Sequence, residues 1–178
     1  MIEAARKFAT EAHKDQMRKG TNRPYIVHPL EVFEIVKTMT RDEEILSAAL
    51  LHDTIEDCPW VTREILAEQF GERVAWIVAC ESEDKSKSWL DRKGHTIEYL
   101  KTAPREVQIV ALGDKLSNMR DIAKDYPVVG EDLWKRFRMK DKAWIGWYYL
   151  GVCQSLEKDL SGEKAYLEYR KLVQENFG

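Results

Sequence analysis

The amino-acid sequence predicts an all-α fold, and three observations support that prediction. Charged residues make up 33% of the chain, above the roughly 25% of average globular proteins, as is typical of amphipathic helices with solvated outer faces. Only nine Gly and five Pro are present, which argues against a turn-rich sandwich or barrel. Apolar residues recur at helical spacing along most of the chain. We expect one domain, residues 1–178, with a sizeable core and roughly eight to ten helices.

Breakers of the apolar pattern set the ends of the predicted helices. Gly20 and Pro24 place residues 18–28 in a loop, and Pro29 suits the first turn of the helix that follows. The segment 105–112 is the one stretch whose pattern also fits a strand. Helices are predicted at residues 2–17, 29–39, 42–57, 62–70, 72–80, 89–102, 104–124, 131–138, 141–160 and 163–176.

Composition excludes several classes of protein. With 28 Lys and Arg against 31 Asp and Glu, the net charge is −3, which disfavours a nucleic-acid binder. Three Cys without CxxC spacing provide neither a disulfide framework nor a thiolate metal site, so a reduced, cytoplasmic chain is expected. The N-terminus has charges every few residues and no signal-peptide core. The uncharged run 143–156 is shorter than the ~20 residues that a bilayer needs, so no membrane partner is expected.

The segment from Leu50 to Asp57 is the most unusual in the chain. It places His52 and three carboxylates, among them Asp53 and Glu56, at the end of an apolar helix. At helical spacing these side chains share adjacent faces. Packed carboxylates repel one another, so the cluster favours a bound cation or a shared proton. A solvated helix end is the alternative, but the apolar run just upstream carries the helix into the core, where unpartnered carboxylates would be costly.

Two further segments carry candidate ligands. His28 lies between apolar residues, where a lone histidine is usually a core or loop residue. Asp114 and Asn118 lie one helical turn apart in an apolar helix, a pattern that is also typical of an ordinary amphipathic surface. Nitrogen and oxygen ligands of this kind fit Mn, Fe, Co, Ni or Zn and do not choose among them. Basic residues gather near both ends of the motif region, as an anionic substrate would need, although single surface cations are most often only solvated.

Six short motifs occur in one order within residues 4–125. They are Gln16–Gly20 (QMRKG), Pro24–Pro29 (PYIVHP), Ala48–Asp57 (AALLHDTIED), Phe70–Gly71, Asp84–Ser86 (DKS) and Asp114–Arg120 (DKLSNMR). A His-Asp dipeptide alone would be weak evidence, but these motifs together are specific. The chain therefore resembles the HD-superfamily hydrolases that degrade alarmones, the hydrolase half of RelA/SpoT-like proteins, and above all the stand-alone small alarmone hydrolases. The resemblance fades beyond Tyr126, which leaves residues 126–178 as a helical extension.

The resemblance implies an all-α HD domain with one divalent metal, typically Mn²⁺ in this family. The residues at the ligand positions are His28, His52, Asp53 and Asp114, and those of the catalytic acidic pair are Glu56 and Asp57. Positions that contact the substrate in the family are occupied by Arg18, Lys19, Lys85, Asn118 and Arg120, with Arg23, Ser86 and Lys115 as secondary candidates. The implied partner is a phosphorylated guanine nucleotide.

The implied reaction is hydrolysis of the 3′-pyrophosphate of (p)ppGpp to GDP or GTP and pyrophosphate. The metal would lower the pKa of a water molecule, Glu56 would take its proton with Asp57 as partner, and the basic residues would neutralise phosphate charge. Other functions stay open: an HD-type phosphatase that acts on another nucleotide, such as (p)ppApp, NADPH or a nucleoside monophosphate, and a non-catalytic nucleotide sensor. The sequence also leaves a homo-oligomer open.

Overall fold

The computed structural model describes all residues 1–178 and is entirely helical apart from loops. Ten α-helices and one 3₁₀-helix follow one another, and the only β-type pairing is an isolated bridge between Met17 and Pro24. The all-α prediction and its expected number of helices are therefore confirmed. The helices are α1 (Ile2–Ala12), α2 (Val27–Lys37), α3 (Glu43–Leu51), α4 (Thr54–Asp57), α5 (Arg63–Phe70), α6 (Glu72–Glu81), α7 (Trp89–Leu100), α8 (Arg105–Val129), the 3₁₀-helix η1 (Gly130–Arg136), α9 (Lys142–Leu160) and α10 (Lys164–Phe177).

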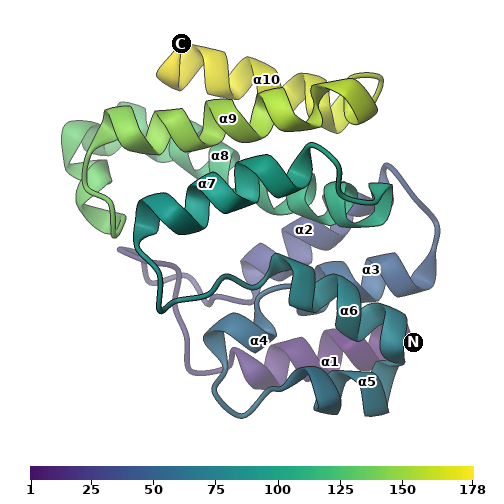
Figure 1. The fold of residues 1–178 in the computed structure, drawn as a ribbon. Coiled ribbons are helices and arrows are strands. Elements are labelled where there is room, and N and C mark those ends of the chain that lie inside the picture. Colours follow the sequence, from purple (N-terminus) through teal and green to yellow (C-terminus); the bar gives the residue numbers. More distant parts are fainter.

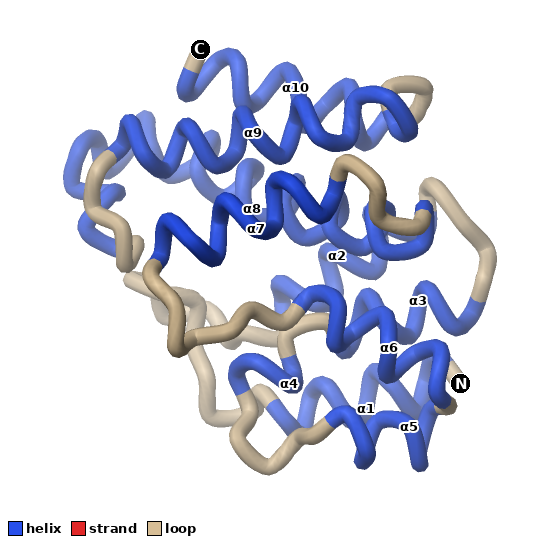
Figure 2. Tube along the Cα trace, viewed as in Figure 1, coloured by secondary structure: helices blue, strands red, loops and turns tan.

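Helix α8 is the centre of the arrangement. One group of helices, α1 to α6, occupies the lower part of Figure 1, and α7, α9 and α10 lie above it. Helix α8 packs on α2, α3 and α6 of the first group and on α9 and α10 of the second. The tube view in Figure 2 shows how the longer loops between these helices gather mainly on one side of the molecule. A residue on α8 can therefore meet side chains from both groups.

A single hydrophobic core joins the two groups of helices. It contains 43 buried residues, from Ala5 near the N-terminus to Val173 in α10. Gly113 marks a close approach within it, because a Cβ atom at this position would lie 2.8 Å from Cγ2 of Val36. The backbone of α8 thus comes unusually near α2 one residue before Asp114. None of the helices combines the length and the apolar character that a bilayer crossing requires.

The predicted helix 42–57 is divided in the structure. Helix α3 ends at Leu51, and the short helix α4 begins at Thr54. The hydroxyl of Thr54 donates a 2.7 Å hydrogen bond to the Leu51 carbonyl oxygen. In a continuous helix this oxygen would accept a hydrogen bond from a backbone N–H instead. His52 and Asp53 lie in this turn, outside both helices. The break turns both side chains toward α2 and α8.

Further helix bounds differ from the predicted ones, and among them α2 begins at Val27 rather than at Pro29. Helix α1 ends at Ala12 rather than at residue 17, because the chain turns so that the Tyr25 amide donates to the Gln16 carbonyl. Helix α8 runs past Pro127, which costs only one hydrogen bond in the last turn, and ends at Gly130 with φ +67°. The predicted helix 131–138 is the 3₁₀-helix η1, and the strand-compatible segment 105–112 is helical.

Candidate metal centre and active-site pocket

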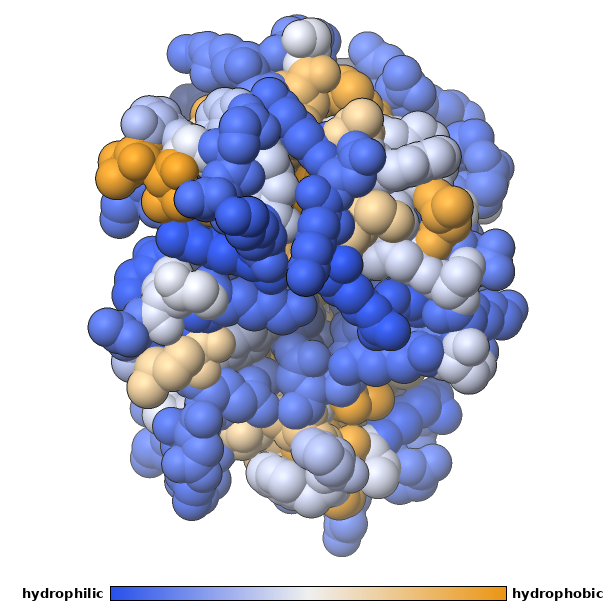
Figure 3. Space-filling view, turned by 90° about the vertical axis from the view of Figure 1, so that its left-hand side faces the viewer, coloured by the Kyte–Doolittle hydropathy of each residue, from blue (hydrophilic) through white to orange (hydrophobic).

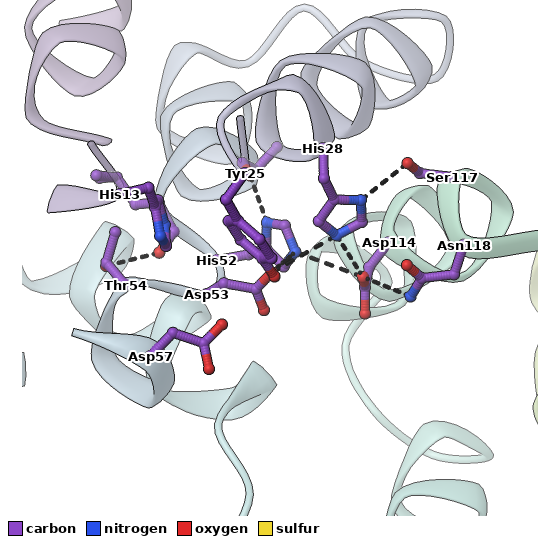
Figure 4. Close-up of polar contacts among 12 residues, drawn as sticks. His13, Tyr25, His28, His52, Asp53, Thr54, Asp57, Asp114, Ser117 and Asn118 are labelled. Atoms are coloured by element: carbon purple, nitrogen blue, oxygen red, sulfur yellow. Dashed lines mark hydrogen bonds and ion pairs between the residues drawn. The ribbon is translucent and has the colours of Figure 1, made fainter. Parts of the chain in front are cut away.

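Four side chains from four different segments converge beside α8. His28 comes from the first turn of α2, His52 and Asp53 from the turn between α3 and α4, and Asp114 from α8. One ligand atom from each lies within 4.8 Å of the others. Figure 4 shows the two imidazole rings and the two carboxylates directed at a common point. His28, His52 and Asp114 are buried.

The far side of each imidazole ring is held by a hydrogen bond. Nδ1 of His28 lies 2.9 Å from the Ser117 hydroxyl, which itself donates to Glu31 at 2.6 Å. Nδ1 of His52 lies 2.8 Å from the Ala49 carbonyl oxygen. These contacts orient both rings with Nε2 toward the common point, as is usual for metal-bound histidines.

The chemistry of this cluster fits a divalent metal. Nε2 of His52 is buried and has no hydrogen-bond partner, although it lies 2.9 Å from an Asp53 oxygen. Nε2 of His28 lies 3.0 Å from an Asp114 oxygen. Two imidazole nitrogens and two carboxylate oxygens at one point form a set that first-row divalent ions accept. The four predicted ligands are thus brought together in a geometry that would hold one metal.

Electrostatics within the cluster balance burial against opposite charges. Burial lowers the pKa of His28 despite the neighbouring Asp114, which keeps this imidazole neutral. Burial also disfavours the charged form of His52, but Asp53 and Asp114 outweigh it and raise the His52 pKa. For Asp114, burial is outweighed by the Lys115 ammonium and the two imidazoles, so its pKa lies well below the usual range. The carboxylates are therefore anionic, the form that ligates a cation.

The acidic pair Glu56 and Asp57 lies on the neighbouring helix α4. Burial, reinforced by the Asp53 carboxylate, raises the pKa of Glu56 to about 7. The pKa of Asp57 is raised too, by burial and by Asp53. The Lys85 ammonium lies 3.7 Å from an Asp57 oxygen and donates to the Glu56 carbonyl at 3.2 Å. A carboxyl with a pKa near neutrality is suited to accept and release a proton.

A pocket of about 400 Å³ surrounds these residues. This volume is in the usual range of small-molecule sites. In Figure 3 the corresponding face is mostly hydrophilic and is hollowed near its middle. Its wall includes apolar side chains from the C-terminal part of the chain, such as Leu133, Ile145 and Tyr149. The pocket thus combines charged groups with an apolar surface on which a nucleoside could lie.

Most of the predicted substrate contacts line this pocket. Arg18 donates to Asn118 at 3.1 Å and to Asp121 at 2.7 Å, and Lys115 donates to Asp114 at 2.6 Å. The predicted residues in the pocket wall are Arg18, Lys19, Arg23, Lys85, Lys115 and Asn118.

Two predicted contacts lie outside the pocket. The Arg120 guanidinium forms two hydrogen bonds to Glu168 on α10, at 2.7 and 2.8 Å, and an ion pair with Glu31. The Ser86 hydroxyl donates to Asp84 on an exposed turn. Both residues belong to motifs whose other members reach the pocket, so motif membership alone does not place a side chain there.

The structure brings to the pocket residues that the sequence did not assign to the site. The Tyr25 hydroxyl donates a 2.5 Å hydrogen bond to Asp53. Lys93 lies 4.8 Å from the centre of the Tyr148 ring and is paired with Glu83 at 2.7 Å. Ser117 could have been found from its helical spacing of three residues from Asp114. Tyr148 carries no such signal, because it reaches the pocket through the packing of α9.

A second, larger groove lies on another part of the surface. Its volume is about 1190 Å³, and its lining comes from α7, α9 and the last residues of the chain, among them Trp147 and His95. It contains none of the four clustered ligands and neither member of the acidic pair. The chemistry of the chain is therefore concentrated in the smaller pocket.

Comparison with known proteins agrees with this geometry. A family profile described as an HD domain matches residues 5–138. Guanosine-3′,5′-bis(diphosphate) 3′-pyrophosphohydrolase MESH1 of Xenopus tropicalis is 34% identical over 171 residues, which cover 94% of this chain and 88% of that protein. A guanosine-3′,5′-bis(diphosphate) 3′-pyrophosphohydrolase of Aquifex aeolicus is 37% identical over 124 residues, which cover 68% of this chain and 18% of the longer relative.

Solved structures show the same likeness. A metazoan orthologue of SpoT, described as hydrolysing ppGpp and acting in starvation responses, superposes with a TM-score of 0.80 at 25% identity, over 98% of this chain and 94% of that one. The protein lmo0812 of Listeria monocytogenes superposes with a TM-score of 0.77 at 32% identity, over 84% of this chain and 98% of that one. These findings confirm the resemblance inferred from the motifs: the chain belongs to the HD domain family, alongside the SpoT-like pyrophosphohydrolases.

Proposed function

We propose that this protein is a metal-dependent hydrolase that removes the 3′-pyrophosphate of (p)ppGpp, with GDP or GTP and pyrophosphate as products. The observation that carries the proposal is the convergence of His28, His52, Asp53 and Asp114 beside an acidic pair in one cation-lined pocket. Support for the substrate comes from the relatives, because MESH1 of Xenopus tropicalis, named for this activity, matches nearly the whole chain.

One divalent ion, Mn²⁺ in our proposal, would be held by these four residues. When bound, such an ion polarises a phosphoryl oxygen and lowers the pKa of a water molecule. The mixed nitrogen and oxygen donors suit Mn²⁺ without excluding Fe, Co, Ni or Zn. The Ser117–Glu31 hydrogen bonds keep His28 oriented for this task.

The residues of the chain would carry the proton and the charge. Glu56, with a pKa of about 7, accepts a proton from the attacking water. The water oxygen forms a bond to the phosphorus on the ribose 3′ oxygen, and the bond between that phosphorus and the 3′ oxygen breaks. The 3′ oxygen takes up the proton that Glu56 accepted, so a 3′ hydroxyl and pyrophosphate result. Lys85 lies next to the acidic pair and would neutralise charge on the departing group. Arg18, held by Asn118 and Asp121, would bind the rest of the nucleotide.

The test is pyrophosphate release from ppGpp by metal-stripped protein, with and without added Mn²⁺. We expect release only with the metal, with GDP as the second product, and no release by Asp114→Ala under the same conditions. Folded, Mn²⁺-loaded protein that releases no pyrophosphate from ppGpp would contradict the proposal. Parallel assays with ppApp, NADPH and nucleoside monophosphates would then identify another nucleotide substrate, and tight ppGpp binding without turnover would indicate a sensor.

A further inference from the structure

The part of the pocket wall beside Asp121 and Asp125 of α8 carries a second group of cationic side chains. Two segments far apart in the chain supply it, the loop 18–24 and residues 136–138 at and after the end of η1. Five cations of this group line the pocket against two carboxylates on α8, Asp121 and Asp125, so positive charge is in excess. The cations are Arg18, Lys19, Arg23, Arg136 and Arg138.

The two segments are in direct contact. Gly20 has φ +70°, and a Cβ atom placed on it would lie 2.7 Å from Cδ of Arg136, so the arginine side chain lies across the loop. Arg136 is also held by Asp125 at 2.8 Å, while Arg18 and Arg23 are held by Asp121 at 2.7 and 3.4 Å. These three guanidiniums are therefore fixed side by side along one face of α8, since residues four apart lie on the same face.

Arg138 differs from the other arginines of the group. It is exposed and lines the pocket, and it makes no hydrogen bond or ion pair with the chain. Lys19 is exposed and unpaired in the same way. The donors of both side chains are thus available to an anionic ligand. A guanidinium is well suited to this task, because its planar fork matches a phosphate with two parallel hydrogen bonds.

Positions along α8 give the distance from the metal centre to the carboxylates that hold this group. Asp121 and Asp125 follow the metal ligand Asp114 by two and three helical turns, which at 1.5 Å per residue is about 10 and 16 Å along the axis. A 3′-pyrophosphate whose reacting phosphorus lies at the metal centre cannot extend across this distance and also reach Lys85 beside the acidic pair. Arg136, which pairs with Asp125 at the far end of this interval, therefore faces a different anionic part of the substrate, whereas Arg18, which donates to Asn118, lies closer to the metal centre.

We infer that the arginines of this second group, Arg136 and Arg138 above all, bind the phosphates on the 5′ side of the nucleotide and make the enzyme select substrates by the number of those phosphates. The inference rests on the proposed function and deepens it. Apolar side chains that line the same pocket, such as Leu133 and Ile145, leave a surface for the nucleoside. Specificity at the 5′ side is then supplied by residues that provide no metal ligand.

The experiment compares three substrates that share guanosine 3′-diphosphate and carry one, two or three phosphates at the 5′ oxygen. For the Mn²⁺-loaded protein we expect kcat/KM to rise along this series, mainly through a falling KM. In Arg138→Ala, KM for the 5′-triphosphate should rise roughly tenfold, as expected for the loss of a charge-assisted hydrogen bond, while kcat stays unchanged. Arg138→Lys should retain part of the preference. Lys140→Ala, an equal change of charge at an exposed residue that does not line the pocket, is the matched control.

Equal kcat/KM values for the three substrates, or an unchanged series in Arg138→Ala, would overturn the inference and leave the proposed hydrolysis standing. If none of the substrates is hydrolysed, calorimetric binding of GTP and of guanosine to the unmodified protein and to Arg138→Ala tests the 5′ site independently of the proposed hydrolysis. Weaker binding of GTP but not of guanosine to Arg138→Ala supports the 5′ site even then. Identical binding of GTP to both proteins overturns it.

Discussion

Gly113 faces Val36 so closely that no side chain fits between them: a Cβ atom on Gly113 would lie 2.8 Å from Cγ2 of Val36 and 3.1 Å from Cγ1 of Val32. The contact joins α8 to α2, and the next residue along α8 is Asp114. His28 lies on α2, and its Nε2 atom lies 3.0 Å from an Asp114 oxygen. The absence of a side chain at Gly113 thus sets the spacing of His28 and Asp114, two proposed metal ligands that are far apart in the chain.

Gly113→Ala is expected to overpack this contact. Inserting a methyl group into a close-packed core costs about 1–3 kcal/mol, and moving α2 away from α8 should also weaken Mn²⁺ binding. Thermal unfolding and Mn²⁺ titration measure the two effects. Gly94→Ala is the matched control, because a Cβ atom there meets nothing within 4 Å, and the substitution favours the helix by about 0.5–1 kcal/mol. Unchanged stability and unchanged metal affinity in Gly113→Ala would show that the interface adapts.

His52→Ala should abolish stoichiometric Mn²⁺ binding. The substitution removes a buried imidazole whose Nε2 has no hydrogen-bond partner in the chain, so the metal loses a ligand that nothing nearby replaces. Metal content after dialysis is the measurement. His95→Ala, on α7 and away from the cluster, should keep one equivalent of metal. Full metal content in His52→Ala would exclude His52 as a ligand.

Glu56→Gln should bind Mn²⁺ like the unmodified protein and lose turnover by roughly 10²–10⁴-fold, the usual contribution of a general base. In the unmodified protein, burial and the Asp53 carboxylate raise the Glu56 pKa to about 7. The group must be deprotonated to accept a proton, so kcat should fall as the pH drops through 7 and level off above it. A pH profile of kcat at saturating substrate and metal tests this sign. A profile that is flat around pH 7 would assign the proton transfer to another group.

Arg120→Ala should leave KM for ppGpp unchanged, although Arg120 belongs to a motif that matches the family. Its guanidinium is engaged by Glu168 and Glu31, outside the pocket. The ion pair is more than a third exposed, so its loss should cost less than about 1 kcal/mol of stability. Arg18→Ala, which removes a pocket-lining guanidinium, should instead raise KM several-fold. Similar KM changes in the two variants would mean that Arg120 turns toward the substrate when it binds.

The sequence predicted the helices better than the details of how they meet, and the four residues that it offered as ligands lie together in the structure. Apolar periodicity was enough for α9 and α10, whose ends agree with the prediction to within about one residue. It failed at His52 and Asp53, where a continuous helix was expected, because the hydrogen bond from Thr54 to Leu51 is a local side-chain effect that periodicity does not contain.

Long-range contacts explain the rest of what the sequence missed. Two examples are the hydrogen bonds from His28 through Ser117 to Glu31 and the hydrogen bond from Arg120 to Glu168. Both depend on how α2, α8 and α10 pack. No local pattern reports such packing. The position of Arg136 across Gly20 is of the same kind, since it joins segments that only the folded chain brings together.

Helix α9 contributes Ile145, Tyr148 and Tyr149 to the pocket wall, yet it supplies no metal ligand and neither acidic residue. It also lies beyond residue 138, where the match to the HD domain profile ends. One part of the pocket wall therefore comes from a helix that is separate along the chain from the residues proposed for the chemistry. Substitutions in this helix could redirect the enzyme to a new nucleotide while the reaction centre is inherited intact, so the family can diversify its substrates without rebuilding its catalyst.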